Sequence, residues 1–302
     1  MRSPVPKCEG PGAPSQCVMR FRVLKCEGPG APSQVDKYMP IRFDHKPGLV
    51  AYLTAGDPSI DATRDIAIAA IDAGADVIEL GVPFSDPLAD GPIIQRASER
   101  ALARGTNLKQ VLAVAREIRA ARPAAGLVIF TYLNPILRYG LARFADDAKA
   151  AGADGVLATD MIVEEAAEYL AELARVDLAP IFLAAPTSPD ERLEAIAKNS
   201  KGFVYAISRT GITGKQQSVA AEAAELVERI RRWTTLPVAV GFGISNAEHF
   251  AQVAEFADAA AVGSAIVELI ERTALTEGPG SAPGAVARFI EGLRQPHAAP
   301  AR

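Results

Sequence analysis

Two patterns of hydrophobic and polar residues alternate along the chain from residue 49 onward. The first is a short run of consecutive apolar residues, which is typical of parallel strands covered by helices on both faces. This pattern predicts eight strands: Leu49–Leu53, Val77–Leu80, Leu127–Tyr132, Gly155–Ala158, Pro180–Leu183, Phe203–Ile207, Pro237–Val240 and Ala259–Val262.

The second pattern is an alanine-rich segment with helical periodicity, which lies between successive strands. One apolar stripe comprises Ala62, Ile66, Ala69 and Ala73, and another comprises Ala223, Leu226, Val227, Ile230 and Trp233. The sequence Ala-Gly-Ala-Asp ends two of these helices, at residues 73–76 and 151–154. Glycine at this position favours the left-handed conformation that turns a helix into the next strand.

Eight strand–helix units predict an α/β fold of one domain, a closed (β/α)8 or TIM barrel, over residues 39–295. A doubly wound open sheet is the alternative. It is disfavoured because no Gly-x-Gly-x-x-Gly follows the first strand. We expect residues 296–302 to be a disordered tail.

The first 38 residues differ in composition from the rest. The ten letters KCEGPGAPSQ occur at Lys7–Gln16 and again at Lys25–Gln34. So much glycine, proline and serine offers little to bury, so we expect a disordered extension that ends before Met39. One cysteine per repeat without histidine is a weak metal signal, and we predict no metal.

Charge and cysteine content restrict the function. The net charge is −4, which gives no basic surplus for a nucleic acid or an acidic membrane surface. No apolar run approaches the ~18 residues of a membrane span. All three cysteines lie within the first 26 residues, so a disulfide framework is not expected. These features predict a cytoplasmic protein that acts on small molecules.

Glu79 is the first candidate for catalysis. Period-two alternation in the second strand places Val77 and Glu79 on the face opposite Ile78, so Glu79 should point into the barrel mouth. Apolar surroundings raise the pKa of a carboxyl group toward the range that suits a general acid or base. A structural ion pair with a nearby lysine or arginine is the alternative.

The loop after this strand, Pro83–Pro92, contains three prolines and two further carboxylates. Prolines restrict the loop's backbone, so it could hold Asp86 or Asp90 over the mouth. Each aspartate could instead cap a turn or the next helix, which is a common role beside glycine or proline. The residues alone leave both readings open.

Three glycine-containing segments follow the last three strands, at residues 211–214, 241–245 and 263–265. Glycine lets backbone N–H groups approach an anion, and a helix that begins at Ser264 would direct its positive end at the same place. Barrel phosphate sites recur at these strands, so we predict a phosphate cradle rather than tight turns alone. No histidine or lysine stands at a strand end, which favours chemistry by carboxylates without a metal.

The stretch Glu79–Pro92 (ELGVPFSDPLADGP) resembles the characteristic motif of tryptophan synthase alpha chains. Four further segments match that family in order and spacing: Leu53–Pro58, Ser208–Gly214, Gly241–Ser245 and Gly263–Val267. The resemblance covers roughly residues 49–271.

This resemblance implies a carbon–carbon lyase of tryptophan biosynthesis that cleaves indole-3-glycerol phosphate into indole and glyceraldehyde 3-phosphate. It implies that Glu79 is the general acid and base, and that Asp90 accepts the indole N–H. The implied substrate-binding residues are Tyr52, Tyr132, Tyr205, Thr213, Gly214, Phe242, Gly243, Gly263 and Ser264. It also implies that this chain has no cofactor and forms an alpha2-beta2 heterotetramer with a beta chain that carries pyridoxal phosphate.

The sequence departs from the family before the first strand. Family members have a helix there that plugs the bottom of the barrel, whereas residues 39–48 are short and contain proline and glycine. Two other functions remain as alternatives. One is a different phosphate-binding barrel enzyme, and the other is an inactive subunit that only activates a beta chain.

Overall fold

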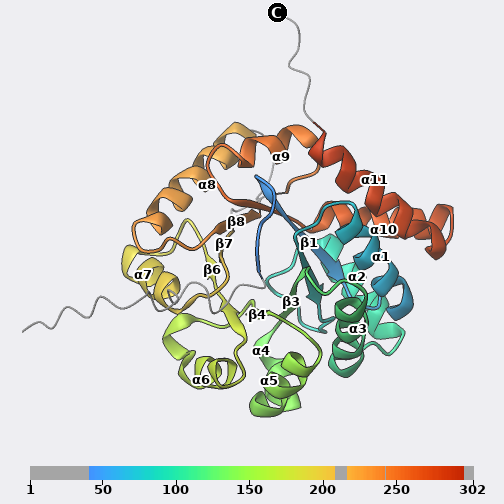
Figure 1. Cartoon of the computed structure of the whole chain (residues 1–302), viewed down its shortest axis with the longest axis horizontal. Helices are drawn as coiled ribbons and strands as arrows, with labels where there is room; N and C mark the ends of the chain where they lie inside the picture. Colours follow the sequence, from blue (N-terminus) through green and yellow to red (C-terminus); the bar gives the residue numbers. More distant parts are fainter. Residues whose placement is uncertain (1–40, 208–215, 242, 296–302) are drawn as a thin grey trace, which may run out of the picture.

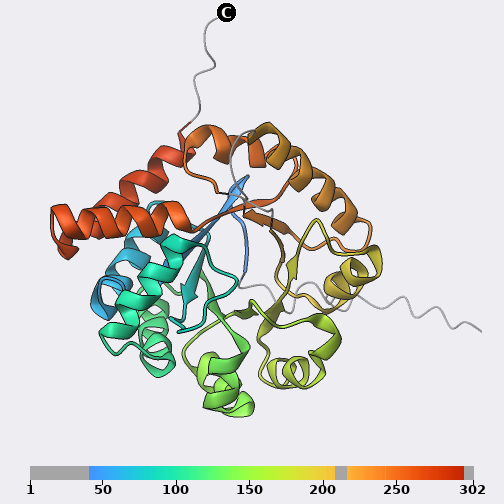
Figure 2. The same cartoon turned by 180° about the vertical axis from the view of Figure 1, so that it is seen from behind.

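The computed structural model describes residues 41–207, 216–241 and 243–295. Within these residues a ring of helices surrounds a central parallel sheet (Figure 1), and the same ring is seen from behind in Figure 2. The predicted disorder of residues 1–38 and 296–302 lies outside the described part of the chain. The strands are β1 (Gly48–Thr54), β2 (Val77–Gly81), β3 (Gly126–Thr131), β4 (Gly155–Ala158), β5 (Ala179–Ile181), β6 (Leu183–Ala184), β7 (Val204–Ile207), β8 (Val238–Gly241) and β9 (Ala259–Val262).

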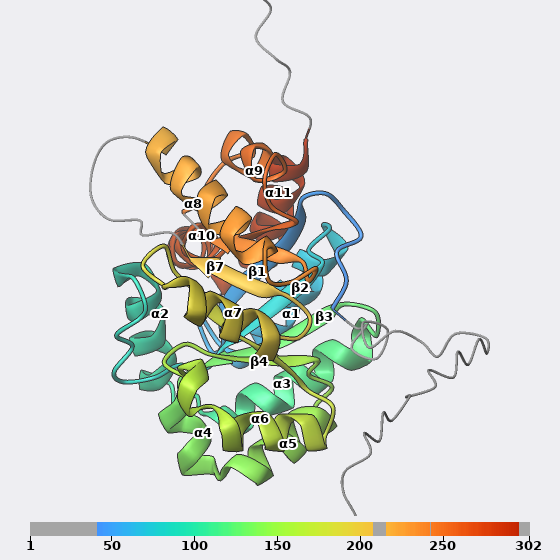
Figure 3. The same cartoon turned by 90° about the vertical axis from the view of Figure 1, so that its left-hand side faces the viewer.

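The helices follow the strands in the expected alternation. They are α1 (Ile60–Asp72), α2 (Pro92–Ala103), α3 (Leu108–Ala121), α4 (Leu133–Tyr139), α5 (Leu141–Ala150), α6 (Ala167–Arg175), α7 (Asp190–Asn199), α8 (Gln216–Arg231), α9 (Ala247–Val253), α10 (Ser264–Thr276) and α11 (Ala282–Arg294), with 3₁₀ turns at Val163–Glu165 and Pro279–Ser281. A side view shows α8 to α11 at one edge of the barrel and α3 to α6 at the opposite edge (Figure 3).

The sheet runs in the order β5-β4-β3-β2-β1-β9-β8-β7-β6, and each pair is parallel. Its two ends meet within one stretch of chain, because β5 pairs with β4 while β6 pairs with β7, and only Phe182 separates them. The segments β5 and β6 are therefore two halves of the predicted fifth strand. This closure confirms the TIM barrel.

Alternate residues of each strand face two different cores. Ile78 and Leu80 belong to the large core between the sheet and the helices, whereas Val77 packs in the barrel interior. Phe203 belongs to the same interior cluster and contacts Phe43 edge-on, with 5.9 Å between ring centroids. The predicted face assignment of β2 is therefore confirmed, and it leaves Glu79 on the interior side.

The helix stripes are only partly as predicted. In α1 the fully buried residues are Thr63, Ile66, Ala67 and Ala70, so the buried face is rotated from the expected alanine stripe. Alanine occurs all round this helix, so its spacing does not single out one face. In the second stripe Ala223, Leu226, Val227 and Ile230 are buried. Trp233 lies beyond the end of α8 and is 39% exposed.

Candidate active site

A cavity of about 370 Å³ opens where the strands end at their carboxyl termini. This is the end at which TIM barrels place their chemistry, because the loops after the strands gather there. Its wall includes Tyr52, Glu79, Asp90, Ile93, Ile94, Phe130, Thr159, Tyr205, Gly243, Gly263 and Ser264.

Glu79 lies in this cavity wall, on β2, with its side chain fully buried. Neither carboxyl oxygen has a hydrogen-bond partner among the described residues, so the predicted alternative of an ion pair finds no partner there. Burial disfavours the charged form and raises the pKa of Glu79 to about 8. The group is therefore mostly protonated at neutral pH, and it can donate a proton to a bound molecule.

Asp90 lies at the end of the following loop and also lines the cavity. The Tyr132 hydroxyl donates a hydrogen bond to Asp90 Oδ2 at 3.0 Å, and the same hydroxyl accepts one from the Ala89 N–H at 3.0 Å. Burial raises the pKa of Asp90 to about 6, although the bond from Tyr132 opposes this shift. Asp90 is therefore mostly ionised at neutral pH and is available as an acceptor.

The two aspartates of the loop differ in position. Asp86 is exposed and accepts a hydrogen bond from the Ser85 hydroxyl at 2.6 Å, whereas Asp90 faces the cavity. Of the two candidates, Asp90 lines the cavity and Asp86 does not. Gln95 donates from Nε2 to the Asp90 carbonyl at 2.9 Å and ties the loop to the start of α2.

The three predicted tyrosines occupy two kinds of position. Tyr52 and Tyr205 line the cavity, and burial raises the pKa of both hydroxyls. The Tyr52 ring meets Phe130 edge-on at 5.0 Å between centroids. Tyr132, which was expected to line the pocket, instead supports Asp90 and packs beside Phe84 at 5.0 Å.

Only part of the predicted phosphate cradle lies within the described residues. Helix α10 begins at Ser264 with Gly263 as its N-cap, and both residues line the cavity. The first N–H groups of a helix have no partner within it, so they can bind an anion. Gly243 also lines the cavity, and its φ of 73° lies in the left-handed region that favours glycine. Thr213, Gly214 and Phe242 lie outside the described residues.

Sequence reasoning missed several residues of the cavity wall. Ile93 and Ile94 come from the first turn of α2, and Phe130 and Thr159 come from the ends of β3 and β4. Their apolar or neutral side chains carry no chemical signal in a sequence. Only the strand-end positions of Phe130 and Thr159 could have indicated them.

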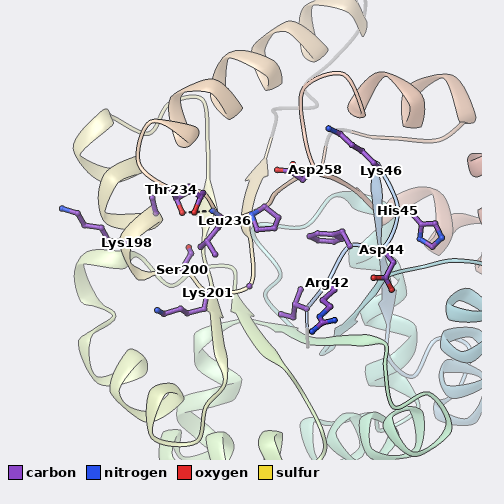
Figure 4. Close-up of a pocket in the computed structure, with 16 residues that line it drawn as sticks. Arg42, Asp44, His45, Lys46, Lys198, Ser200, Lys201, Thr234, Leu236 and Asp258 are labelled. Atoms are coloured by element: carbon purple, nitrogen blue, oxygen red, sulfur yellow. Dashed lines mark hydrogen bonds between the residues drawn. The ribbon is translucent and has the colours of Figure 1, made fainter. Parts of the chain in front are cut away.

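A second, larger cavity of about 700 Å³ lies at the opposite end of the barrel (Figure 4). Its wall includes Phe43, Lys46, Ser200 and Asp258, which belong to segments that precede strands rather than follow them. Residues 41–46 form one side of it, so this is where the predicted shortening of the barrel plug falls. Size alone does not make it the active site, because Glu79 and Asp90, whose pKa values burial raises to about 8 and about 6, lie at the mouth.

Neither a metal cluster nor a membrane span occurs in the described part of the chain. No group of three or more histidine, cysteine, aspartate or glutamate residues in the described ranges could hold a metal ion. No helix in the same ranges is long and apolar enough to cross a membrane.

Comparison with known proteins agrees with this geometry. The family model for the tryptophan synthase alpha chain matches residues 40–287. The tryptophan synthase alpha chain of Solibacter usitatus is 53% identical over 78% of this chain and 87% of its own length. That of Geobacter sulfurreducens is 47% identical over 85% of this chain and 96% of its own length.

Solved structures give the same result. Tryptophan synthase subunit alpha from Legionella pneumophila superposes with a TM-score of 0.78 and 35% identity, covering 86% of this chain and 96% of that one. A chain of the tryptophan synthase complex from Pyrococcus furiosus has a TM-score of 0.73 and 37% identity, covering 82% of this chain and 98% of that one. The chain therefore belongs to the tryptophan synthase alpha chain family, because the family model and these relatives match it over most of its length.

Proposed function

We propose that Glu79 and Asp90 perform the lyase reaction of this family, the cleavage of indole-3-glycerol phosphate into indole and glyceraldehyde 3-phosphate. The observation that carries the proposal is Glu79 itself. A fully buried carboxyl group without a described partner is costly for a fold, so its presence in the mouth cavity is best explained by catalysis.

Glu79 acts first as an acid and then as a base. Its pKa of about 8 keeps the proton on the group at neutral pH, and that proton is transferred to C3 of the indole ring. The resulting carboxylate takes the proton of the glycerol hydroxyl next to the ring. The bond between C3 and the glycerol carbon then breaks, its electron pair returns to the ring, and an aldehyde forms.

Asp90 stabilises the intermediate. Protonation at C3 places positive charge on the indole nitrogen, and an ionised carboxylate that accepts the N–H lowers the energy of that state. The Tyr132 hydroxyl bonds to Asp90 Oδ2 at 3.0 Å and so orients the carboxylate. The substrate phosphate binds at the N-terminus of α10, beside Gly263 and Ser264.

The direct test is turnover of indole-3-glycerol phosphate by the purified chain and by Glu79→Gln, measured as indole released. Loss of the acid and base lowers the rate by about 10²–10⁴-fold, because general acid–base catalysis contributes that much. Turnover by Glu79→Gln at the wild-type rate would remove Glu79 from the mechanism. Failure of the wild-type chain on this substrate, while it turns over another phosphorylated sugar derivative, would favour a different phosphate-binding barrel enzyme.

We also propose that the mouth face binds a tryptophan synthase beta chain in an alpha2-beta2 heterotetramer, which consumes the indole. Leu88 lies in the Pro83–Pro92 loop beside the mouth and is 94% exposed, so a partner on this face would cover it. Pyridoxal phosphate would belong to that partner, and the reaction would take place in the cytoplasm.

The partner is tested by adding a cognate beta chain and measuring indole-3-glycerol phosphate cleavage. Docking on the mouth face should favour the position of the Pro83–Pro92 loop in which Asp90 faces the cavity, and so raise the turnover of the alpha chain. Leu88→Asp should abolish that rise, because a charged side chain cannot be buried in an apolar contact without cost. No complex and no rise in rate would leave an isolated lyase.

A further inference from the structure

Helix α2 covers one side of the mouth cavity. Its first turn contributes Ile93 and Ile94 to the cavity wall. One turn further on, the buried Ala97 packs with Tyr52 of β1 and Val267 of α10. The position of this helix therefore shapes the cavity. It also affects the position of Asp90, which immediately precedes the N-cap residue of the helix.

Arg100 fixes the other end of α2 to both neighbouring elements. Its Nε donates to Asp57 Oδ1 at 3.0 Å and its Nη2 donates to Asp57 Oδ2 at 2.6 Å. This bidentate ion pair is buried on the aspartate side, because the Asp57 side chain is only 4% exposed. Its Nη1 donates to Glu271 Oε1 at 2.6 Å. Arg96, one turn earlier, lies 3.6 Å from Glu271 Oε2.

Arg100 and its two partners, Asp57 and Glu271, belong to or follow three elements that border the cavity. Asp57 follows β1, which carries Tyr52, and Glu271 lies on α10, whose N-terminus is at Ser264. Arg100 lies on α2, which follows Asp90. A guanidinium fork holds two carboxylates at fixed angles, which a flexible lysine ammonium does not do.

We propose that Arg100 is a positioning residue, which holds α2 against β1 and α10 so that Asp90 stands at the correct distance from the phosphate end of the cavity. This inference rests on the proposed function, because it assigns Asp90 to the reaction. Arg100 itself is outside the cavity wall and acts through the helix that it holds. A displacement of about 1 Å at a catalytic group can cost about 10²-fold in rate.

The test compares Arg100→Leu with Arg119→Leu. Arg119 is a close match, because its side chain is 21% exposed against 27% for Arg100, and it forms a comparable bond of 2.5 Å to the buried Asp154. It lies at the other end of the barrel, where Asp154 also accepts from the Leu127 N–H at the start of β3. Arg100→Leu loses the pairs with Asp57 and Glu271, and Arg119→Leu loses the pair with Asp154 together with bonds to three backbone carbonyls. Only Arg100→Leu loses a group that holds the mouth.

We expect Arg100→Leu to lower kcat by about 10- to 100-fold at a temperature where circular dichroism shows it folded, with a smaller change in KM. The acid limb of its kcat/KM profile should move to lower pH, because a loosened α2 lets water reach Asp90 and lowers the pKa that burial had raised. Arg119→Leu should lower Tm and leave kcat and the acid limb unchanged. Arg100→Lys should recover only part of the rate.

The inference is overturned if Arg100→Leu lowers Tm alone, as Arg119→Leu does, or if Arg100→Lys restores the whole rate. Glu79→Gln in the same assay separates this outcome from failure of the proposed function. When Glu79→Gln is inactive and folded Arg100→Leu is fully active, the mechanism stands and the positioning role is wrong. When both are fully active, the proposed function is wrong as well.

Discussion

The two ends of the barrel treat their buried carboxyl groups in opposite ways, and two residues three positions apart show it. Asp76, just before β2, accepts from the Leu49 N–H at 2.7 Å and from Arg294 Nη2 at 2.9 Å, and pairs with His45 at 2.8 Å. Glu79, within β2, has no such partner in the described structure. The floor satisfies its carboxylates and so stabilises the fold, whereas the mouth leaves one unsatisfied and so keeps it reactive.

The largest expected contrast is in stability. Asp76→Ala should lower the free energy of unfolding by about 3–5 kcal/mol, because removing one partner of a buried pair leaves Arg294 uncompensated. Glu79→Gln should not destabilise the protein. Denaturant titration of both variants measures this, and equal losses would show that the two ends of the barrel do not differ.

The raised pKa of Glu79 also makes the stability of the protein depend on pH. The folded state raises the pKa of Glu79, so it binds a proton that the unfolded chain releases, and wild-type stability falls as pH rises from about 4.5 toward 8. The glutamine side chain of the Glu79→Gln variant does not titrate. The stability of Glu79→Gln relative to wild type should therefore increase across that range, and a difference that stays constant with pH would contradict the raised pKa.

Activity should show a bell-shaped profile that reports both mouth carboxyls. In kcat/KM, the acid limb should fall below about pH 6 as Asp90 becomes protonated, and the basic limb should fall above about pH 8 as Glu79 loses its proton. A rate profile from about pH 5 to about pH 9 spans both limbs. Persistence of the acid limb in Asp90→Asn would assign that limb to another group.

Asp90→Asn should reduce the rate less than Glu79→Gln does. An amide oxygen still accepts the indole N–H, so geometry is kept while the negative charge that stabilises the cation is lost. Tyr132→Phe is the milder companion, since it removes only the hydroxyl that bonds Asp90 at 3.0 Å. Steady-state rates of the two variants give the order, and wild-type activity in Asp90→Asn would exclude Asp90 from the reaction.

The smallest effect is expected from removal of the N-terminal extension. We predict that deleting residues 1–38 changes neither turnover nor Tm, because the repeat of glycine, proline and serine has little apolar surface to bury. Thermal unfolding of the shortened chain checks this. A large fall in Tm would show that the extension packs into the floor cavity, which residues 41–46 border.

Much of this molecule could be read from the sequence. The continuous apolar runs indicated the strands because a strand covered on both faces tolerates few polar groups, and for the same reason Glu79 stood out within β2. Alternation then predicted the side of the sheet that Glu79 faces. The glycines at residues 74 and 152 were expected to be left-handed, and their φ values are 107° and 83°.

Tertiary structure decided the rest, because it brings together residues that are far apart in the chain. That Asp90 rather than Asp86 lines the cavity is a tertiary fact, and the Tyr132 hydroxyl that bonds Asp90 lies 42 positions away. The contact of Arg100 with both Asp57 and Glu271 links residues 43 and 171 positions apart, and no local pattern encodes it. Sequence periodicity reports which face of an element is buried, whereas the packing of α2 against β1 and α10 determines what that face meets.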